Sequence, residues 1–209
     1  MKLRLCSLFL IGLLLTGCGK DTVDNLVEMT SVVQIESTKA VFEEESLEIT
    51  SEETEESETE VEPYILNFTA TTVDGEELTS SCFSNSKLTM INVWATYCNP
   101  CLSEMPDLGE IAADYDSAEF QIIGVVSDVA EGSNEETIAN VKDLITQTNA
   151  NYPHLLLSES LYTNLVGMVD SVPTTFFVNE KGEPLGYVIG ARSKESWEEI
   201  INELLAEIE

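Results

Sequence analysis

Hydrophobic and polar positions follow two periods in the part of the chain that begins at Pro63. Short runs of β-branched and aromatic residues predict strands, and apolar positions three and four residues apart predict helices with one buried face. The predicted strands are residues 64–69, 89–94, 121–126, 155–157, 174–178 and 185–189. Strands separated by helices indicate an α/β domain.

Helical spacing recurs in three segments. The apolar residues are Leu102, Met105, Leu108, Ile111, Ala112 and Tyr115 in the first, Ile138, Val141, Leu144 and Ile145 in the second, and Trp197, Ile200, Ile201, Leu204, Leu205 and Ile208 in the third. Ser193 is placed to cap the start of the third helix. Residues 179–182, Asn-Glu-Lys-Gly, supply a hairpin turn between the last two strands. We therefore expect a central mixed β-sheet flanked by helices.

The first 18 residues follow neither period. Lys2 and Arg4 precede an apolar run over residues 5–15, which is the pattern of a secretory signal peptide. The run is shorter than the roughly 20 residues that a permanent span needs, which disfavours a retained signal anchor. Residues 15–18, Leu-Thr-Gly-Cys, resemble the lipobox of bacterial lipoproteins. This resemblance implies lipidation at Cys18, a mature chain that begins there, and an anchor at the membrane; an ordinary signal peptide with an incidental cysteine is the alternative.

Residues 19–62 are dominated by Glu, Ser and Thr, with 15 Asp and Glu against two Lys. Like charges repel and little apolar surface is available for burial, so we interpret this segment as a disordered acidic tether. Residues 63–209 are also acidic, with 24 Asp and Glu against five Lys and Arg. A net charge of −30 would be repelled by phosphate backbones and anionic headgroups, so nucleic acid is excluded as a partner and lipid must hold the protein at its membrane.

The most specific chemical signal is Cys98 and Cys101, within residues 94–101, Trp-Ala-Thr-Tyr-Cys-Asn-Pro-Cys. The pair follows a buried strand and opens a helix, which is the context of a redox-active CxxC. Backbone N–H groups and the dipole at a helix N-terminus stabilise an anion, so Cys98 can be the attacking thiolate near neutral pH. Pro100 fits the first turn, where its missing N–H costs no hydrogen bond. We expect Cys98 to be the nucleophile and Cys101 the resolving thiol.

The alternatives for this pair are a static disulfide and half of a zinc site. Zinc takes about four ligands, and only Cys82 and His154 could complete the set. We interpret Cys82 as a buried free cysteine and His154 as a structural residue. We therefore expect no metal and no cofactor besides the redox-active disulfide.

Residues 93–101, followed by Glu104-Met105-Pro106, resemble the TlpA/ResA-like branch of the thioredoxin superfamily over roughly residues 63–209. The resemblance implies a thioredoxin-like fold, with residues 129–157 as the helix-strand insertion of this branch that shapes the partner surface. Residues 171–178, Ser-Val-Pro-Thr-Thr-Phe-Phe-Val, look like the cis-proline loop of the family, which lies beside the CxxC. A trans proline at the start of an edge strand is the alternative. By resemblance the substrate-binding residues are Trp94, Asn99, Pro100, Val172 and Pro173.

One position departs from thioredoxin proper. The buried carboxylate six residues before the first cysteine is replaced by Asn92, which cannot take a proton from the resolving thiol. Glu104, one turn beyond Cys101, matches a glutamate of the branch, and our hypothesis is that it aids proton transfer at Cys101. The alternative for Glu104 is a solvated first-turn residue that interacts with the helix dipole.

The resemblance implies a reductase of exported proteins at the outer face of the cytoplasmic membrane. In relatives the electron donor is a membrane protein of CcdA/DsbD type, and targets include apocytochrome c and methionine sulfoxide reductase. Peroxidase chemistry on this fold would need Thr and Pro where the chain has Ala95 and Ile91. A non-enzymatic alternative is a lipoprotein binding module or adhesin with a structural CxxC disulfide.

Overall fold

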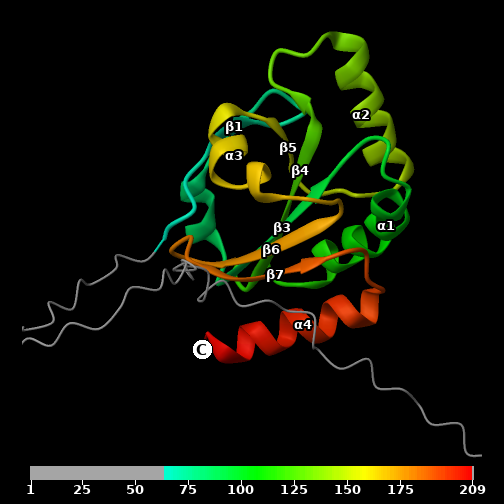
Figure 1. Cartoon of the computed structure of the whole chain (residues 1–209). Coiled ribbons are helices and arrows are strands. Elements are labelled where there is room, and N and C mark those ends of the chain that lie inside the picture. The colour runs from blue at the N-terminus through cyan, green and yellow to red at the C-terminus, as the bar shows by residue number, and fades with distance from the viewer. Residues whose placement is uncertain (1–63, 209) are drawn as a thin grey trace, which may run out of the picture.

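The computed structural model describes residues 64–208. Its central sheet has the strand order β5-β4-β3-β6-β7 (Figure 1). The strands are β3 (Leu88–Trp94), β4 (Phe120–Ala130), β5 (His154–Leu157), β6 (Thr174–Asn179) and β7 (Pro184–Ile189). β4 is parallel to β3 and β5, whereas β6 is antiparallel to β3 and β7. The predicted mixed sheet is therefore confirmed.

Helices cover both faces of this sheet. α1 (Asn99–Asp114), α2 (Glu135–Gln147) and α4 (Lys194–Glu207) contribute to the core on one face, and α3 (Glu159–Asn164) packs on the other. Successive side chains of a strand point to opposite faces, so Met90 and Trp94 of β3 join the first core while Ile91 and Val93 join the second. The three predicted helices correspond to α1, α2 and α4.

Two local predictions are confirmed by hydrogen bonds. Ser193 is the N-cap of α4, and its side chain accepts a hydrogen bond from the backbone N–H of Ser196 at 3.4 Å. In the β6–β7 hairpin, the N–H of Gly182 donates to the carbonyl of Asn179 at 2.9 Å. Gly182 has φ of +81°, a conformation that residues with a Cβ rarely adopt, which explains glycine in this turn.

The strand predicted over residues 64–69 is wrong. Residues 64–68 are irregular, and the strand that follows is β1 (Thr69–Thr71), which pairs with β2 (Glu77–Thr79) in a separate two-stranded sheet. Leu66 and Phe68 are buried while Asn67 is exposed, so the alternation that suggested a strand comes from an extended segment lying on the second core. The N–H of Leu66 donates to Gly182 in the β6–β7 turn rather than to a neighbouring strand.

Other elements lie beyond what the pattern predicted. The short β2 and α3 were not expected, and β4 extends four residues past its predicted end. The predicted insertion contains α2 and β5, and β5 forms the edge of the sheet beside β4.

The predicted signal peptide and tether, residues 1–18 and 19–62, lie outside the described residues. Within residues 64–208, none of the helices has the length and apolar character to cross a bilayer.

Candidate active site

Cys98 and Cys101 form a disulfide at the N-terminus of α1, with their Cα atoms 5.3 Å apart. Cys98 is the N-cap residue, and its sulfur accepts a hydrogen bond from the backbone N–H of Cys101 at 3.2 Å. Cys98 retains 5% of its surface and Cys101 none, whereas Asn99 and Pro100 beside them are exposed. The helix therefore directs an N–H group at one sulfur, and that sulfur belongs to the cysteine nearer to solvent.

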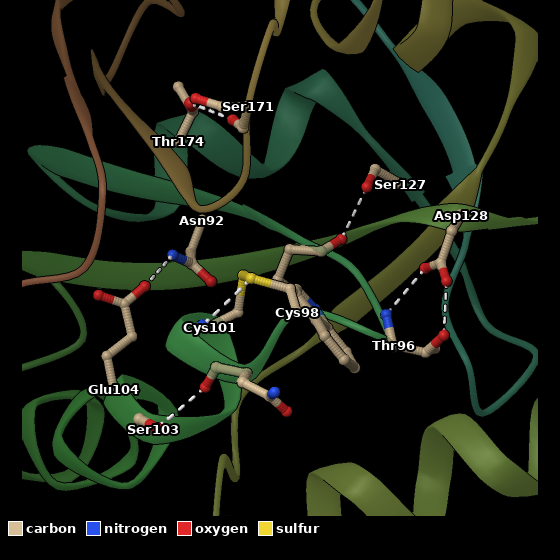
Figure 2. The surroundings of a disulfide bond; sticks show 12 residues. Asn92, Thr96, Cys98, Cys101, Ser103, Glu104, Ser127, Asp128, Ser171 and Thr174 are labelled. Carbon is tan, nitrogen blue, oxygen red and sulfur yellow. Dashed lines mark hydrogen bonds between the residues drawn. A yellow bond between two sulfur atoms is a disulfide. The ribbon is translucent and has the colours of Figure 1, made fainter.

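The loop before Cys98 is fixed by the end of β4. Asp128 accepts hydrogen bonds from the backbone N–H and the hydroxyl of Thr96, and the hydroxyl of Ser127 donates to the carbonyl of Trp94 at 2.9 Å (Figure 2). Sequence reasoning missed both residues, because they lie 30 residues beyond the motif. The available signal was the polar pair that directly follows the apolar run of β4.

The proline loop lies at the same end of the sheet. The Val172–Pro173 peptide bond is cis, and Thr174 pairs with Val93 near the end of β3. This register places Pro173 beside the strand end from which the loop to Cys98 departs. The carbonyl of Pro173 accepts a hydrogen bond from the N–H of Gly190 at 2.8 Å, and Val172 is only partly buried.

Glu104 is buried, at 3% exposure, so the alternative of a solvated first-turn glutamate is wrong. Its Oε1 accepts from Nδ2 of Asn92 at 3.1 Å, and its Oε2 accepts from the backbone N–H of Arg192 at 3.1 Å and from Nε1 of Trp197 at 3.4 Å. Burial raises the pKa of the Glu104 carboxyl, and these hydrogen bonds oppose the rise. The carboxyl thus joins α1 to β3, to the β7–α4 loop and to α4.

Asn92 is fully buried in β3. Its Nδ2 donates to Glu104 and also to Oγ1 of Thr175, both at 3.1 Å. Its Oδ1 accepts no hydrogen bond from any of the described residues. In Figure 2 the amide nitrogen points to Glu104, whereas the amide oxygen is turned toward the two sulfur atoms.

The expected substrate contact at Trp94 is wrong. This side chain has no exposed surface, and its Nε1 donates to Nδ1 of His154 at 3.1 Å. The aromatic residue presented beside the disulfide is instead Tyr97, which is 74% exposed. Sequence reasoning missed Tyr97, although its place directly before Cys98 was visible in the motif.

Cys82 is the free cysteine of the described residues, and it is buried. Burial raises the pKa of its thiol to about 11, so it stays protonated and unreactive near neutral pH. Among residues 64–208, no group of three or more His, Cys, Asp or Glu side chains is arranged to hold a metal ion.

Comparison with known proteins gives a consistent result. The model of the AhpC/TSA family matches residues 62–183. Thiol-disulfide oxidoreductase ResA of Bacillus thuringiensis subsp. konkukian is 26% identical over 151 residues, which cover 72% of this chain and 82% of that protein. A thioredoxin-family thiol:disulfide interchange protein from Chlorobium tepidum TLS has a TM-score of 0.57 at 26% identity, covering 68% of this chain and 97% of that one.

A second solved structure, the pneumococcal exposed lipoprotein thioredoxin Etrx1 of Streptococcus pneumoniae strain TIGR4, has a TM-score of 0.53 at 25% identity. It covers 66% of this chain and 98% of that one. The range matched by the family model includes Cys98 and Cys101. The chain therefore belongs to the AhpC/TSA family and is a ResA/TlpA-like thiol-disulfide oxidoreductase of the thioredoxin superfamily.

Proposed function

We propose that this oxidoreductase is a lipid-anchored reductase of disulfides in exported proteins, acting at the outer face of the cytoplasmic membrane. The observation that carries the chemistry is the Cys98–Cys101 disulfide at a helix N-terminus, with Cys98 as its more exposed member. Such a position favours a thiolate at Cys98 after reduction. The disulfide is the redox group, and we propose no other cofactor.

The reaction is two successive thiol-disulfide exchanges. The Cys98 thiolate attacks a substrate disulfide, forming a mixed disulfide and releasing one substrate thiolate. Cys101 then loses its proton and attacks the Cys98 sulfur, which forms the intramolecular disulfide and releases the second substrate thiolate. The substrate gains two electrons and the pair loses two, so a donor must restore the dithiol. We propose a membrane dithiol protein of CcdA/DsbD type as that donor.

Val172, Pro173, Asn99 and Pro100 form the proposed substrate contacts, and Tyr97 is added to them. Extended polypeptide could pair with the backbone at Val172, which leads into β6 and is only partly buried. Apocytochrome c and methionine sulfoxide reductase are the proposed classes of oxidised substrate. Glu104 is proposed to aid removal of the proton from Cys101, because burial makes its carboxyl more basic than usual.

Anchoring is proposed from residues 15–18 and is supported by the similarity to Etrx1, which is an exposed lipoprotein. If Cys18 carries the lipid, the wild-type chain will sediment with membranes in a bacterial host, and Cys18→Ala will be released or retained as an unprocessed precursor. Incorporation of labelled fatty acid into wild type but not Cys18→Ala is the direct measurement. Equal labelling of both would overturn the anchor.

The activity is tested by insulin reduction with dithiothreitol in the presence of the full chain. We expect acceleration by wild type and none by Cys98→Ser, with Cys82→Ser as the matched control that stays active. Titration of the Cys98–Cys101 pair against redox buffers then gives its reduction potential, and hence the direction of electron flow. A potential close to the roughly −270 mV of thioredoxin supports a reductase, and one close to the roughly −120 mV of dedicated oxidants would overturn that assignment.

Substrates are identified with Cys101→Ser, because the mixed disulfide at Cys98 can no longer be resolved. We expect covalent complexes with exported proteins that dissolve on reduction, and none with the Cys98→Ser/Cys101→Ser control. Wild type that neither accelerates insulin reduction nor reacts with alkylating reagents at Cys98 after mild reduction would instead support a binding module with a static disulfide.

A further inference from the structure

The feature that the proposed mechanism leaves unused is the amide oxygen of Asn92. Asn92 has no exposed surface, yet its Oδ1 has no hydrogen-bond partner among the described residues. A buried polar atom without a hydrogen-bond partner destabilises the folded protein, so its retention needs a reason. The disulfide form offers no donor at its sulfur atoms.

The direction of this oxygen is fixed by the other half of the amide. Nδ2 donates to Oε1 of Glu104 and to Oγ1 of Thr175. A rotated amide would place oxygen against the Glu104 carboxylate, which is an acceptor and not a donor. The Glu104 carboxyl is itself held by N–H donors from Arg192 and Trp197. The network therefore turns Oδ1 toward the sulfur atoms, as Figure 2 shows.

Reduction creates the missing donor. When an external dithiol reduces the pair, the S–S bond breaks, the dithiol becomes a disulfide, and two electrons and two protons pass to Cys98 and Cys101. Cys98 can release its proton to solvent, because it lies at the helix N-terminus and keeps some exposure. Cys101 is fully buried, so its sulfur carries its proton as a neutral thiol, and an S–H group is a hydrogen-bond donor.

We infer that Asn92 Oδ1 accepts a hydrogen bond from the Cys101 thiol in the reduced protein. This deepens the proposed function and rests on it for its role in the reaction cycle. The hydrogen bond stabilises the dithiol relative to the disulfide, and it holds the proton on Cys101 until a mixed disulfide forms at Cys98. The reduced pair is thereby the form in which both the nitrogen and the oxygen of the Asn92 amide have hydrogen-bond partners.

The primary test is the S–H stretching band of Cys101 in the reduced full chain, measured by Raman or infrared spectroscopy. Subtracting the spectrum of the reduced Cys101→Ser variant isolates this band from the other thiols. We expect a lower frequency in wild type than in Asn92→Leu, which fills the space with an apolar side chain. A wild-type band at the frequency of a thiol without a hydrogen bond overturns the inference, whatever the result for Asn92→Leu.

The second test is the equilibrium of the Cys98–Cys101 pair with dithiothreitol. Loss of one hydrogen bond should shift this equilibrium about threefold toward the disulfide in Asn92→Ala and Asn92→Leu, or about 14 mV at 29.6 mV per tenfold. Asn92→Asp keeps an oxygen acceptor, and its carboxyl should stay protonated because it lies beside Glu104. We therefore expect its equilibrium constant with dithiothreitol to lie within about 1.5-fold of the wild-type value. Equal constants for wild type and Asn92→Leu would overturn the inference.

Thr89→Ala is the matched control, because it removes a buried hydrogen-bonding side chain from the same strand on the opposite face of the sheet. Thr89 Oγ1 accepts from Nε2 of Gln121 at 2.8 Å. We expect loss of stability in Thr89→Ala without a shift of the S–H band or of the equilibrium.

The outcomes separate the two proposals. Absence of insulin reduction by wild type rejects the proposed function, whereas an unshifted S–H band rejects only the role of Asn92.

Discussion

The indole nitrogen of Trp94 donates a hydrogen bond to Nδ1 of His154 across 3.1 Å in the interior of the protein. An indole N–H can only donate, so Nδ1 carries no proton, and Nε2–H donates to the carbonyl of Ala150 at 3.1 Å. His154 is therefore held neutral in a single tautomer. Trp94 ends the strand that leads to Cys98, so this pair ties the site strand to the edge strand β5.

His154 should make folding stability depend on pH. Burial lowers its pKa from 6.5 to about 4, so between these values the unfolded chain binds a proton that the folded protein does not. The stability contributed by neutral His154 is complete above pH 6.5. As the pH falls from 6.5 to 4, the free energy of unfolding decreases by about 3 kcal/mol. Urea denaturation from pH 7 to 4 measures this loss. The same slope in His154→Gln would contradict the assignment.

Gly124→Ala should destabilise the fold through the same histidine. A Cβ at Gly124 would lie 2.2 Å from Nδ1 of His154, and the buried ring has no room to retreat without losing the hydrogen bond to Trp94. We expect a loss of at least about 2 kcal/mol in the free energy of unfolding. The double variant Gly124→Ala/His154→Ala should lose less than the sum of the single variants. Additive losses would show that the clash lies elsewhere.

Tyr97→Ala should weaken substrate binding without changing the redox pair. Its side chain is 74% exposed beside Cys98, so truncation should alter stability by no more than about 0.5 kcal/mol. Loss of an aromatic contact of about 1 kcal/mol predicts roughly fivefold lower kcat/KM for insulin. Tyr162→Ala is the matched control, because Tyr162 is 58% exposed on α3, on the opposite face of the sheet. Equal effects of the two variants would reject a contact at Tyr97.

The sequence was sufficient for elements whose signal is local. The strand and helix around Cys98 were predictable because a mostly apolar run precedes the motif and Pro100 suits a first helical turn. Ser193 was predictable as a cap for the same reason, since capping depends on the residues that follow within one turn. Residues 64–68 misled the prediction, because alternating burial also arises where an extended segment lies on a core without a strand partner.

The parts of the site that escaped prediction depend on residues distant in the chain. Asp128 and Ser127 fix the loop before Cys98 from the end of β4, and Trp94 is buried because His154 of β5 receives its N–H. Glu104 could be found from its spacing to Cys101. Its burial could not, because that is set by Arg192 and Trp197, about 90 residues later.

Glu104→Gln should change both the pH dependence of stability and the reaction. Burial raises the pKa of this carboxyl in the folded protein above its ordinary 4.5. Between pH 4.5 and the raised pKa, the carboxyl has lost its proton in the unfolded chain but keeps it in the folded protein. The contribution of Glu104 to stability therefore falls as the pH rises through this range. Glu104→Gln lacks this fall.

If Glu104 also removes the proton from Cys101, kcat for insulin should drop about tenfold in Glu104→Gln, with a shifted pH profile. Glu110→Gln, an exposed glutamate on the same helix, should change neither quantity. Loss of the stability effect with unchanged turnover and pH profile would assign Glu104 a purely structural role, joining α1 to Asn92 and to the start of α4.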